Sequence, residues 1–168
     1  ARKTKDKAIN ILQGRCVGGS TTVNWTSSFR TPATTLAHWQ REFGLKEMTV
    51  EAMAPWFDAV ERRLNVRYWD QSPNENNILL REAGWKLGIP VAPIRRNVKG
   101  CWNLGYCGMG CPTDAKQSML VTTLPAALAA GATLVHHLRA ERLVMAGDRI
   151  EALDALVDNL SNWYVRRC

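Results

Sequence analysis

A turn rich in glycine and small polar residues lies near the start of the sequence, and it could hold an anionic ligand. It reads Gly14-Arg15-Cys16-Val17-Gly18-Gly19-Ser20-Thr21-Thr22-Val23-Asn24. Gly18 and Gly19 have no Cβ, so the backbone there can approach a ligand closely. If a helix begins at Ser20, its free N–H groups favour negative charge such as a pyrophosphate. The same residues are also typical of an ordinary loop entering a helix, so both interpretations stay open.

Three cysteines share a second glycine-rich segment. Cys101, Cys107 and Cys111 have the spacing C-x5-C-x3-C-P. Zinc sites prefer closer cysteine pairs and about four ligands, whereas bacterial iron–sulfur sequences end in C-x3-C-P. A three-iron cluster, a cluster with a fourth ligand elsewhere, another metal, and free or disulfide-paired cysteines that shape a loop are the alternatives. Cys16 is expected to be a small core residue, and neither it nor Cys168 is assigned to the cluster.

Side chains suited to acid–base catalysis are few. The sequence has 3 histidines. His38 is expected on a helix in a surface or packing role, and His136 and His137 are adjacent on an expected strand, where their side chains would point to opposite faces. No Gly-x-Gly-x-x-Gly, Gly-x-Ser-x-Gly or His-Glu-x-x-His motif is present. We therefore expect no catalytic residue in this chain.

Charge and hydropathy narrow the class of protein. The net charge is +7, but the 22 basic residues are dispersed and no nucleic-acid-binding motif accompanies them. We expect no nucleic-acid partner. No apolar run reaches about 18 residues, so no membrane span is expected, and no signal peptide is recognised. Hydrophobic residues make up 46% of the chain, and its 7 tryptophans predict a large core or buried contacts between layers.

The spacing of apolar residues, and the Gly and Pro residues that interrupt it, predict a mixed fold, α/β or α+β, that is rich in helices. Helices are expected over 32–43 and 49–64, from a capping box at Ser72–Glu75 to Gly88, and over 126–130 after a capped start at Thr123. Strands are expected over 8–12 and 132–135, and in a hairpin of 143–146 with 150–153. An extended stretch is expected over 91–98, and no clear period follows Leu153.

Three tracts follow one another in a fixed order along the chain. They are Gly14-Arg15-x-x-Gly18-Gly19-Ser20-x-x-x-Asn24, Cys107-Gly-Met-Gly-Cys-Pro-Thr-Asp-Ala-Lys-Gln-Ser118, and the alanine-rich stretch 124–132. Together they resemble the glucose–methanol–choline (GMC) flavin oxidoreductases. The match is best to the bacterial branch that includes long-chain alcohol oxidases and sugar or polyol dehydrogenases. The resemblance covers about residues 3–153.

The resemblance implies an FAD cofactor and the oxidation of an alcohol to a carbonyl, with hydride passing to the flavin. The protein would then be an FAD-dependent alcohol dehydrogenase or oxidase, with an alcohol substrate and an electron acceptor as partners. By position, Arg142 would lie where the family's strand borders the adenine. The residues expected to contact the rest of FAD are Gly18, Gly19, Ser20 and Asn24.

The resemblance further implies a candidate iron–sulfur cluster and a chain that is only a fragment of the whole protein. In the branch that carries a 3Fe–4S cluster, the ligands have the spacing of Cys101, Cys107 and Cys111, and the cluster relays electrons from the flavin to an outside acceptor. Residues 1–153 would be an incomplete FAD-binding domain that ends in a strand hairpin, and 154–168 an unassigned tail. The family's N-terminal βαβ unit and its catalytic histidine would lie outside this chain, which is expected to be an internal fragment, inactive alone. A bacterial protein on the cytoplasmic or periplasmic side of the membrane is expected. The alternative is a stand-alone iron–sulfur or redox-binding module without catalysis.

Overall fold

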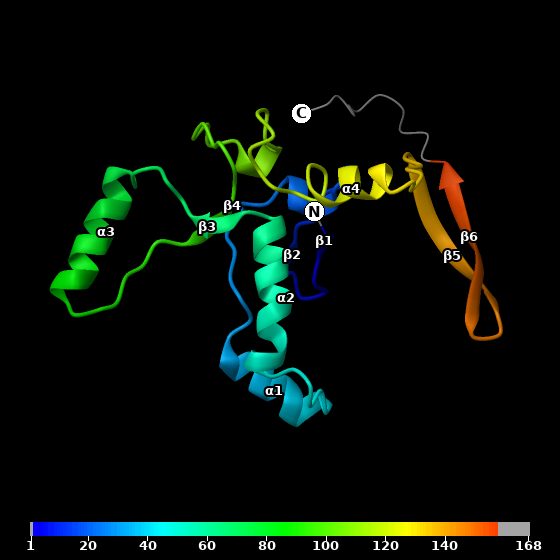
Figure 1. The fold of residues 1–168 in the computed structure, drawn as a ribbon, viewed down its shortest axis with the longest axis horizontal. Coiled ribbons are helices and arrows are strands. Elements are labelled where there is room, and N and C mark those ends of the chain that lie inside the picture. The colour runs from blue at the N-terminus through cyan, green and yellow to red at the C-terminus, as the bar shows by residue number, and fades with distance from the viewer. Residues whose placement is uncertain (1, 158–168) are drawn as a thin grey trace.

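Short arms extend from a central junction in the computed structural model, which describes residues 2–157 (Figure 1). One arm is made of two successive helices, a second of a single helix, and a third of a long hairpin. Within residues 2–157, none of the helices is long and apolar enough to cross a membrane. The arms are, in that order, α1 (Ala33–Phe43) with α2 (Val50–Arg63), α3 (Glu75–Lys86), and β5 (Leu138–Ala146) with β6 (Arg149–Val157).

The strands form antiparallel pairs in the part of the chain that the structure describes. The pairs are β1 (Arg2–Lys3) with β2 (Asn10–Ile11), β3 (Val66–Tyr68) with β4 (Arg95–Asn97), and β5 with β6. In the middle pair, Arg67 lies opposite Arg96. Together with the helices, these small sheets agree with the expected mixed α and β class.

Local sequence signals account for the ends of the helices. Gly44 ends α1 at a φ of 66°, a left-handed conformation that glycine adopts without strain. The Thr49 hydroxyl caps α2 by accepting a hydrogen bond from the Ala52 N–H at 3.1 Å, as expected. The cap expected at Ser72 lies instead at Asn74, whose side-chain oxygen accepts from the Asn77 N–H at 3.0 Å. Pro73 therefore precedes the helix and does not start it.

After α4 (Thr123–Ala129), the structure differs from the strands that the sequence predicts. The strand expected over 132–135 is absent from the structure, and residues 132–137 are irregular. His136 and His137 therefore do not point to opposite faces of a strand; their ring centroids lie 4.6 Å apart. The hairpin is correct and longer than expected, because β6 continues to Val157. A turn at Gly147, with φ at 62°, joins its strands.

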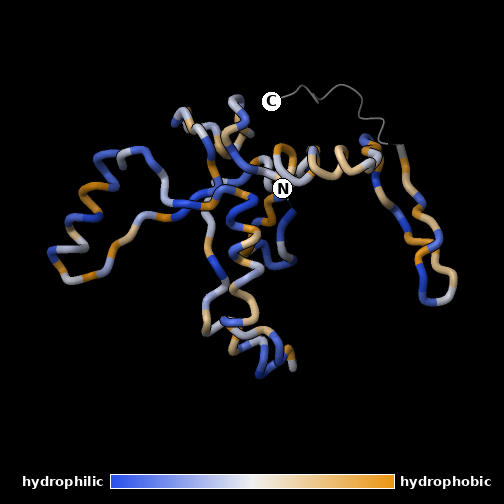
Figure 2. Tube along the Cα trace, in the orientation of Figure 1, coloured by the Kyte–Doolittle hydropathy of each residue, from blue (hydrophilic) through white to orange (hydrophobic). Residues whose placement is uncertain are grey.

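The core is small and largely polar, which contradicts the expectation of a large tryptophan-rich core. In the described chain, the buried hydrophobic residues are Leu36, Val98 and Ala115, and the buried polar residues are Thr26, Asn97, Lys116 and Ser118. Tryptophans 25, 56, 85 and 102 are each more than half exposed. Hydrophobic segments are spread along every arm in Figure 2. Burial is thus concentrated at the junction around Lys116.

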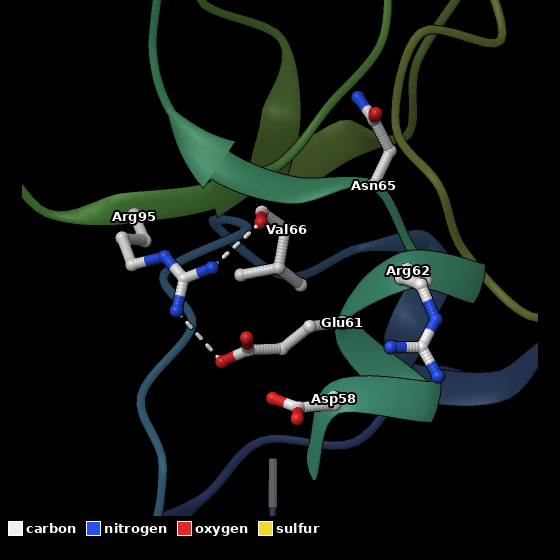
Figure 3. A pocket seen from close by; sticks show the side chains of 6 residues that line it. All are labelled: Asp58, Glu61, Arg62, Asn65, Val66 and Arg95. Atoms are coloured by element: carbon white, nitrogen blue, oxygen red, sulfur yellow. Dashed lines mark hydrogen bonds and ion pairs between the residues drawn. The ribbon is translucent and has the colours of Figure 1, made fainter. Parts of the chain in front are cut away.

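Glu61 on α2 links this helix to two other parts of the chain, and Figure 3 shows the link to Arg95. Arg30 donates to its two carboxylate oxygens at 2.9 and 2.7 Å, and Arg95 on β4 donates to Oε1 at 2.7 Å. Arg95 also donates to the Val66 carbonyl at 2.9 Å, and Arg30 pairs with Asp58. These bonds lower the pKa of Glu61 to about 2, with the hydrogen bond from Arg30 as the largest cause. An open pocket of about 340 Å³ lies beside the network.

We predict that Glu61→Gln lowers the free energy of unfolding at neutral pH by about 1 kcal/mol, since the paired arginines are partly exposed. The pKa of Glu61 is lower in the folded protein than its ordinary value of 4.5. Its ion pairs therefore stabilise the fold above that pH, and the contribution is lost as the pH falls toward 2. Urea unfolding at several pH values measures the difference. Glu42→Gln, at an exposed pair with Arg41, is the control, and a Glu61 effect that persists unchanged below about pH 2.5 would contradict the prediction.

Candidate functional site

The glycine-rich turn folds as a single tight turn, and not as the start of an α-helix. Gly18 and Gly19 have φ values of 87° and 59°, and a four-residue 3-10 helix, η1 (Gly19–Thr22), follows. The Gly19 N–H donates to the Cys16 carbonyl at 2.9 Å, and the Gly14 N–H donates to the Ser20 hydroxyl oxygen at 2.9 Å. Because the helix is so short, its dipole adds little, and close backbone approach is the property that the turn offers a ligand.

The two neighbouring glycines face different surroundings. A Cβ on Gly18 would lie 2.5 Å from the Thr22 hydroxyl oxygen and 2.9 Å from the Leu120 Cβ. A Cβ on Gly19 would meet no atom within 4 Å. Gly18 is therefore the point of close packing against the chain beneath the turn, and Gly19 borders open space that a ligand can enter.

Hydroxyl groups attach the turn to the segment that follows the cysteines. The Thr21 hydroxyl donates to the Gly18 carbonyl at 2.6 Å and accepts from the Met119 N–H at 3.0 Å. The Thr22 hydroxyl donates to the Val17 carbonyl at 3.1 Å. The first sequence tract of the resemblance thus contacts the residue directly after the second tract, 98 positions further along the chain.

Lys116 lies beneath the turn and is 2% exposed. Its ammonium group donates to the Thr22 carbonyl at 2.8 Å, to the Asn24 carbonyl at 2.7 Å, and to the Cys107 carbonyl. Burial is the main cause that lowers the pKa of Lys116. The sequence does not distinguish this residue: it lies within the second tract, and nothing in its local pattern separates a buried lysine from an exposed one.

Asn24 and the residues after it build the side of the junction. The Asn24 side-chain oxygen accepts from the Thr26 N–H at 3.1 Å and so stabilises Thr26 at a φ of 65°. Arg96 donates to the Thr26 hydroxyl oxygen at 2.7 Å and lies over the Trp69 ring, 4.6 Å from its centroid. The Trp25 ring packs on the other glycine-rich segment, where a Cβ on Gly108 would lie 2.8 Å from it.

The three candidate metal ligands each have a different hydrogen-bond partner. The Cys101 sulfur accepts from the Asn103 N–H, and the Cys111 sulfur from the Lys116 N–H, both at 3.4 Å. Cys107 begins the short helix η2 (Cys107–Met109), and its sulfur accepts from Arg96 at 3.3 Å. Over residues 2–157, no group of three His, Cys, Asp or Glu side chains is arranged to hold a metal ion. The geometry gives no support to the expected iron–sulfur cluster.

The remaining cysteines differ from each other and from the expectations. Cys16 is exposed, so its assignment to the core was wrong; its sulfur donates to the Gly19 carbonyl at 3.4 Å. Cys168 lies outside the described residues. Burial raises the pKa of Cys111, but hydrogen bonds from the Lys116 N–H and from Thr113 outweigh it, and the net pKa lies below the ordinary value.

The last proposed cofactor contact, Arg142, is not brought to the turn. It lies on β5, and both of its bonds to Asp154 Oδ2, at 3.0 and 2.6 Å, are made within the hairpin. Figure 1 shows this hairpin extending away from the junction. His38 is on α1 as expected, with its ring 5.8 Å from that of Phe43. Gly18, Gly19, Ser20 and Asn24 are thus together at the junction, and Arg142 is separate.

The contrast between the glycines predicts unequal costs for the same substitution. Gly18→Ala should lower the free energy of unfolding by about 3 kcal/mol, because backbone strain and the clash with Thr22 and Leu120 add. Gly19→Ala should cost about 1 kcal/mol, since only the strain applies. Urea unfolding of the full-length protein, measured without cofactor, compares the two. Equal costs would show that the turn does not pack on Leu120.

Comparison with known proteins identifies the family. A family model described as GMC oxidoreductase matches residues 1–162. An uncharacterized GMC-type oxidoreductase of Mycobacterium tuberculosis is 35% identical over 143 residues, which cover 84% of this chain and 23% of that protein. No solved structure matches the chain significantly.

Two plant relatives carry a named activity. The long-chain-alcohol oxidase FAO4A of Arabidopsis thaliana is 33% identical over 121 residues, covering 72% of this chain and 17% of that protein. FAO4B of the same plant is 32% identical over 167 residues, covering 98% and 21%. The chain thus spans about a fifth of the length of these relatives. With the family model matched over almost the whole sequence, this chain belongs to the GMC oxidoreductase family.

Proposed function

We propose that this chain is part of the cofactor-binding region of an FAD-dependent oxidoreductase that acts on alcohols. The observation that carries the proposal is the open left-handed position of Gly19 in a turn that the rest of the junction fixes. Membership of the GMC family supports FAD as the cofactor, and the long-chain-alcohol oxidases among the relatives support an alcohol as substrate. Residues 1–153 would contribute to the FAD-binding domain, with an electron acceptor as the further partner.

The junction fits a cofactor that carries a pyrophosphate. Gly19 allows a phosphate to approach the backbone, and the exposed Ser20 is its neighbour. Gly18 packs the turn closely against Leu120, and the Asn24 side chain stabilises the following loop through its hydrogen bond with Thr26. When bound, FAD would accept the two electrons removed from the alcohol. Arg142 remains a proposed contact for the adenine half, on the separate hairpin.

The direct test uses the full-length protein. We expect it to purify with bound FAD, visible as flavin absorbance that denaturation releases, and to lose this absorbance anaerobically when 1-dodecanol is added. Flavin that binds but is not reduced by any of a series of alcohols would contradict the substrate class. Protein that folds and binds no FAD would contradict the whole proposal.

We predict that Gly19→Val in the full-length protein prevents stable FAD binding. A branched side chain at this position fills the space that the pyrophosphate needs and is strained at a φ of 59°. The measurement is the flavin content of the purified variant together with its circular dichroism in the far ultraviolet. Normal FAD occupancy in folded protein would reject the assignment of Gly19.

Gly44→Val is the matched control. Gly44 also has a positive φ, 66°, and a Cβ there would also meet no atom within 4 Å, but it ends α1 far from the turn. The variant should share the backbone strain of Gly19→Val and keep its FAD. If both variants lose the flavin, strain and not ligand contact explains the effect.

We further predict that none of the histidines of this chain is the catalytic base. His38, His136 and His137 are exposed, and the last two contact each other. Replacing each by alanine in the full-length enzyme should lower the rate of alcohol oxidation less than about tenfold, whereas a general base contributes roughly 10²–10⁴-fold. The assay is steady-state turnover with flavin content measured in parallel. A loss beyond a thousandfold at one of them, with flavin intact, would place the base in this chain.

A further inference from the structure

We propose that Lys116 is a positioning residue for FAD, because its buried ammonium group holds the backbone of the glycine-rich turn in the conformation that leaves Gly19 open. The inference rests on the proposed function and assigns a role in it to a residue that touches no cofactor. It stands on three hydrogen bonds from one ammonium group, two to the tract of residues 14–24 and one to Cys107.

The donors of Lys116 match the acceptors around it in number. An ammonium group has three N–H donors, and here they reach the carbonyls of Thr22, Asn24 and Cys107. Thr22 is the last residue of η1, three positions after the open glycine, and Asn24 is the last residue of the first sequence tract. The carbonyl of Cys107 belongs to the other glycine-rich segment. The Lys116 side chain therefore connects the glycine-rich turn to the second glycine-rich segment.

The ammonium group of Lys116 also brings a positive charge to the site. The three acceptors are neutral carbonyls, so no carboxylate among these hydrogen-bond partners cancels the buried positive charge. Such a charge beneath the turn favours an anion on the open side, because the field of a buried charge is poorly screened. Lys116 would thus favour a bound pyrophosphate in two ways. It holds the backbone of the turn in shape, and its positive charge attracts the anion.

The backbone around Lys116 is held by contacts that do not involve the ammonium group. Val98 and Lys116 form an antiparallel bridge. Asn97 accepts from the Gln117 N–H at 2.9 Å and donates its side-chain amide to the Gln117 carbonyl at 3.0 Å. Loss of the ammonium group should therefore leave this segment in place and release the turn.

The test compares variants of the full-length protein after removal of the flavin, by titrating each apoprotein with FAD and following quenching of flavin fluorescence. Lys116→Met keeps the length and apolar stem of the side chain without the charge, and Lys116→Gln keeps a shorter donor. Lys99→Met is the control, because Lys99 is exposed and its backbone N–H still donates to Ala115. We expect the Kd for FAD to rise at least about tenfold for Lys116→Met, less for Lys116→Gln, and under about twofold for the control.

Two further measurements separate positioning from simple support of the fold. Visible circular dichroism of the bound flavin, at saturating FAD, should change in Lys116→Met and not in Lys99→Met. Thermal unfolding of the apoproteins shows whether a variant is folded. A Kd and a flavin spectrum like those of the wild type, in a variant that is merely less stable, would overturn the proposal.

Two outcomes need a further comparison: a Lys116→Met variant that does not fold, and a wild-type protein that does not bind FAD. If Lys116→Met gives no folded apoprotein, Lys116→Gln decides: a Kd raised more than about threefold with an altered flavin spectrum supports the positioning role, and a smaller change rejects it. If the wild-type protein itself does not bind FAD, the proposed function fails, and that result is read from the wild-type titration before any variant is compared.

Discussion

The buried ammonium group of Lys116 is the interaction on which the junction depends. Moving such a charge out of water costs several kcal/mol, and the cost is offset only when its donors are fully used. Here they reach three backbone carbonyls, two in the glycine-rich tract and one at Cys107. Each of those carbonyls would otherwise face the same unfavourable burial. The polar contacts around Lys116 therefore fix the positions of backbone segments that few apolar contacts hold together.

This arrangement explains why most buried residues lie at the junction, whereas the helices and the hairpin of the arms are held by local interactions. The described chain buries only a few apolar side chains, so its arms rely on interactions within themselves or with a near neighbour. The Thr49 and Asn74 caps fix helix ends, the network at Glu61 ties α2 to β4, and backbone pairing holds the long hairpin together. Ion pairs and caps of this kind each contribute on the order of 1 kcal/mol. The exposed apolar side chains of the arms contribute little to the stability of the described residues.

Adjacent glycines in the turn illustrate how one motif can meet two requirements. Gly18 is needed because Leu120 and Thr22 leave no room for a side chain, which is a demand of packing. Gly19 borders open space, so its value lies in access to the backbone and in a positive φ. A sequence signature records both glycines alike, although only one of them faces the space that a ligand would occupy.

The sequence by itself determined the local features and the family resemblance. The α1 stop at Gly44, the Thr49 cap and the hairpin turn at Gly147 follow from backbone preferences that act over a few residues. The absent strand over 132–135 and the exposed tryptophans were not predictable in this way, because strand pairing and burial depend on partners distant in sequence. Tertiary structure alone decided that Lys116 is buried under the turn, that Gly18 and Gly19 differ, and that Cys101, Cys107 and Cys111 have separate partners. The first two depend on contacts between segments far apart in the chain, and spacing along a sequence does not encode which segments meet. The cysteine partners lie within 11 positions of each cysteine, and the folded backbone of that segment decides them.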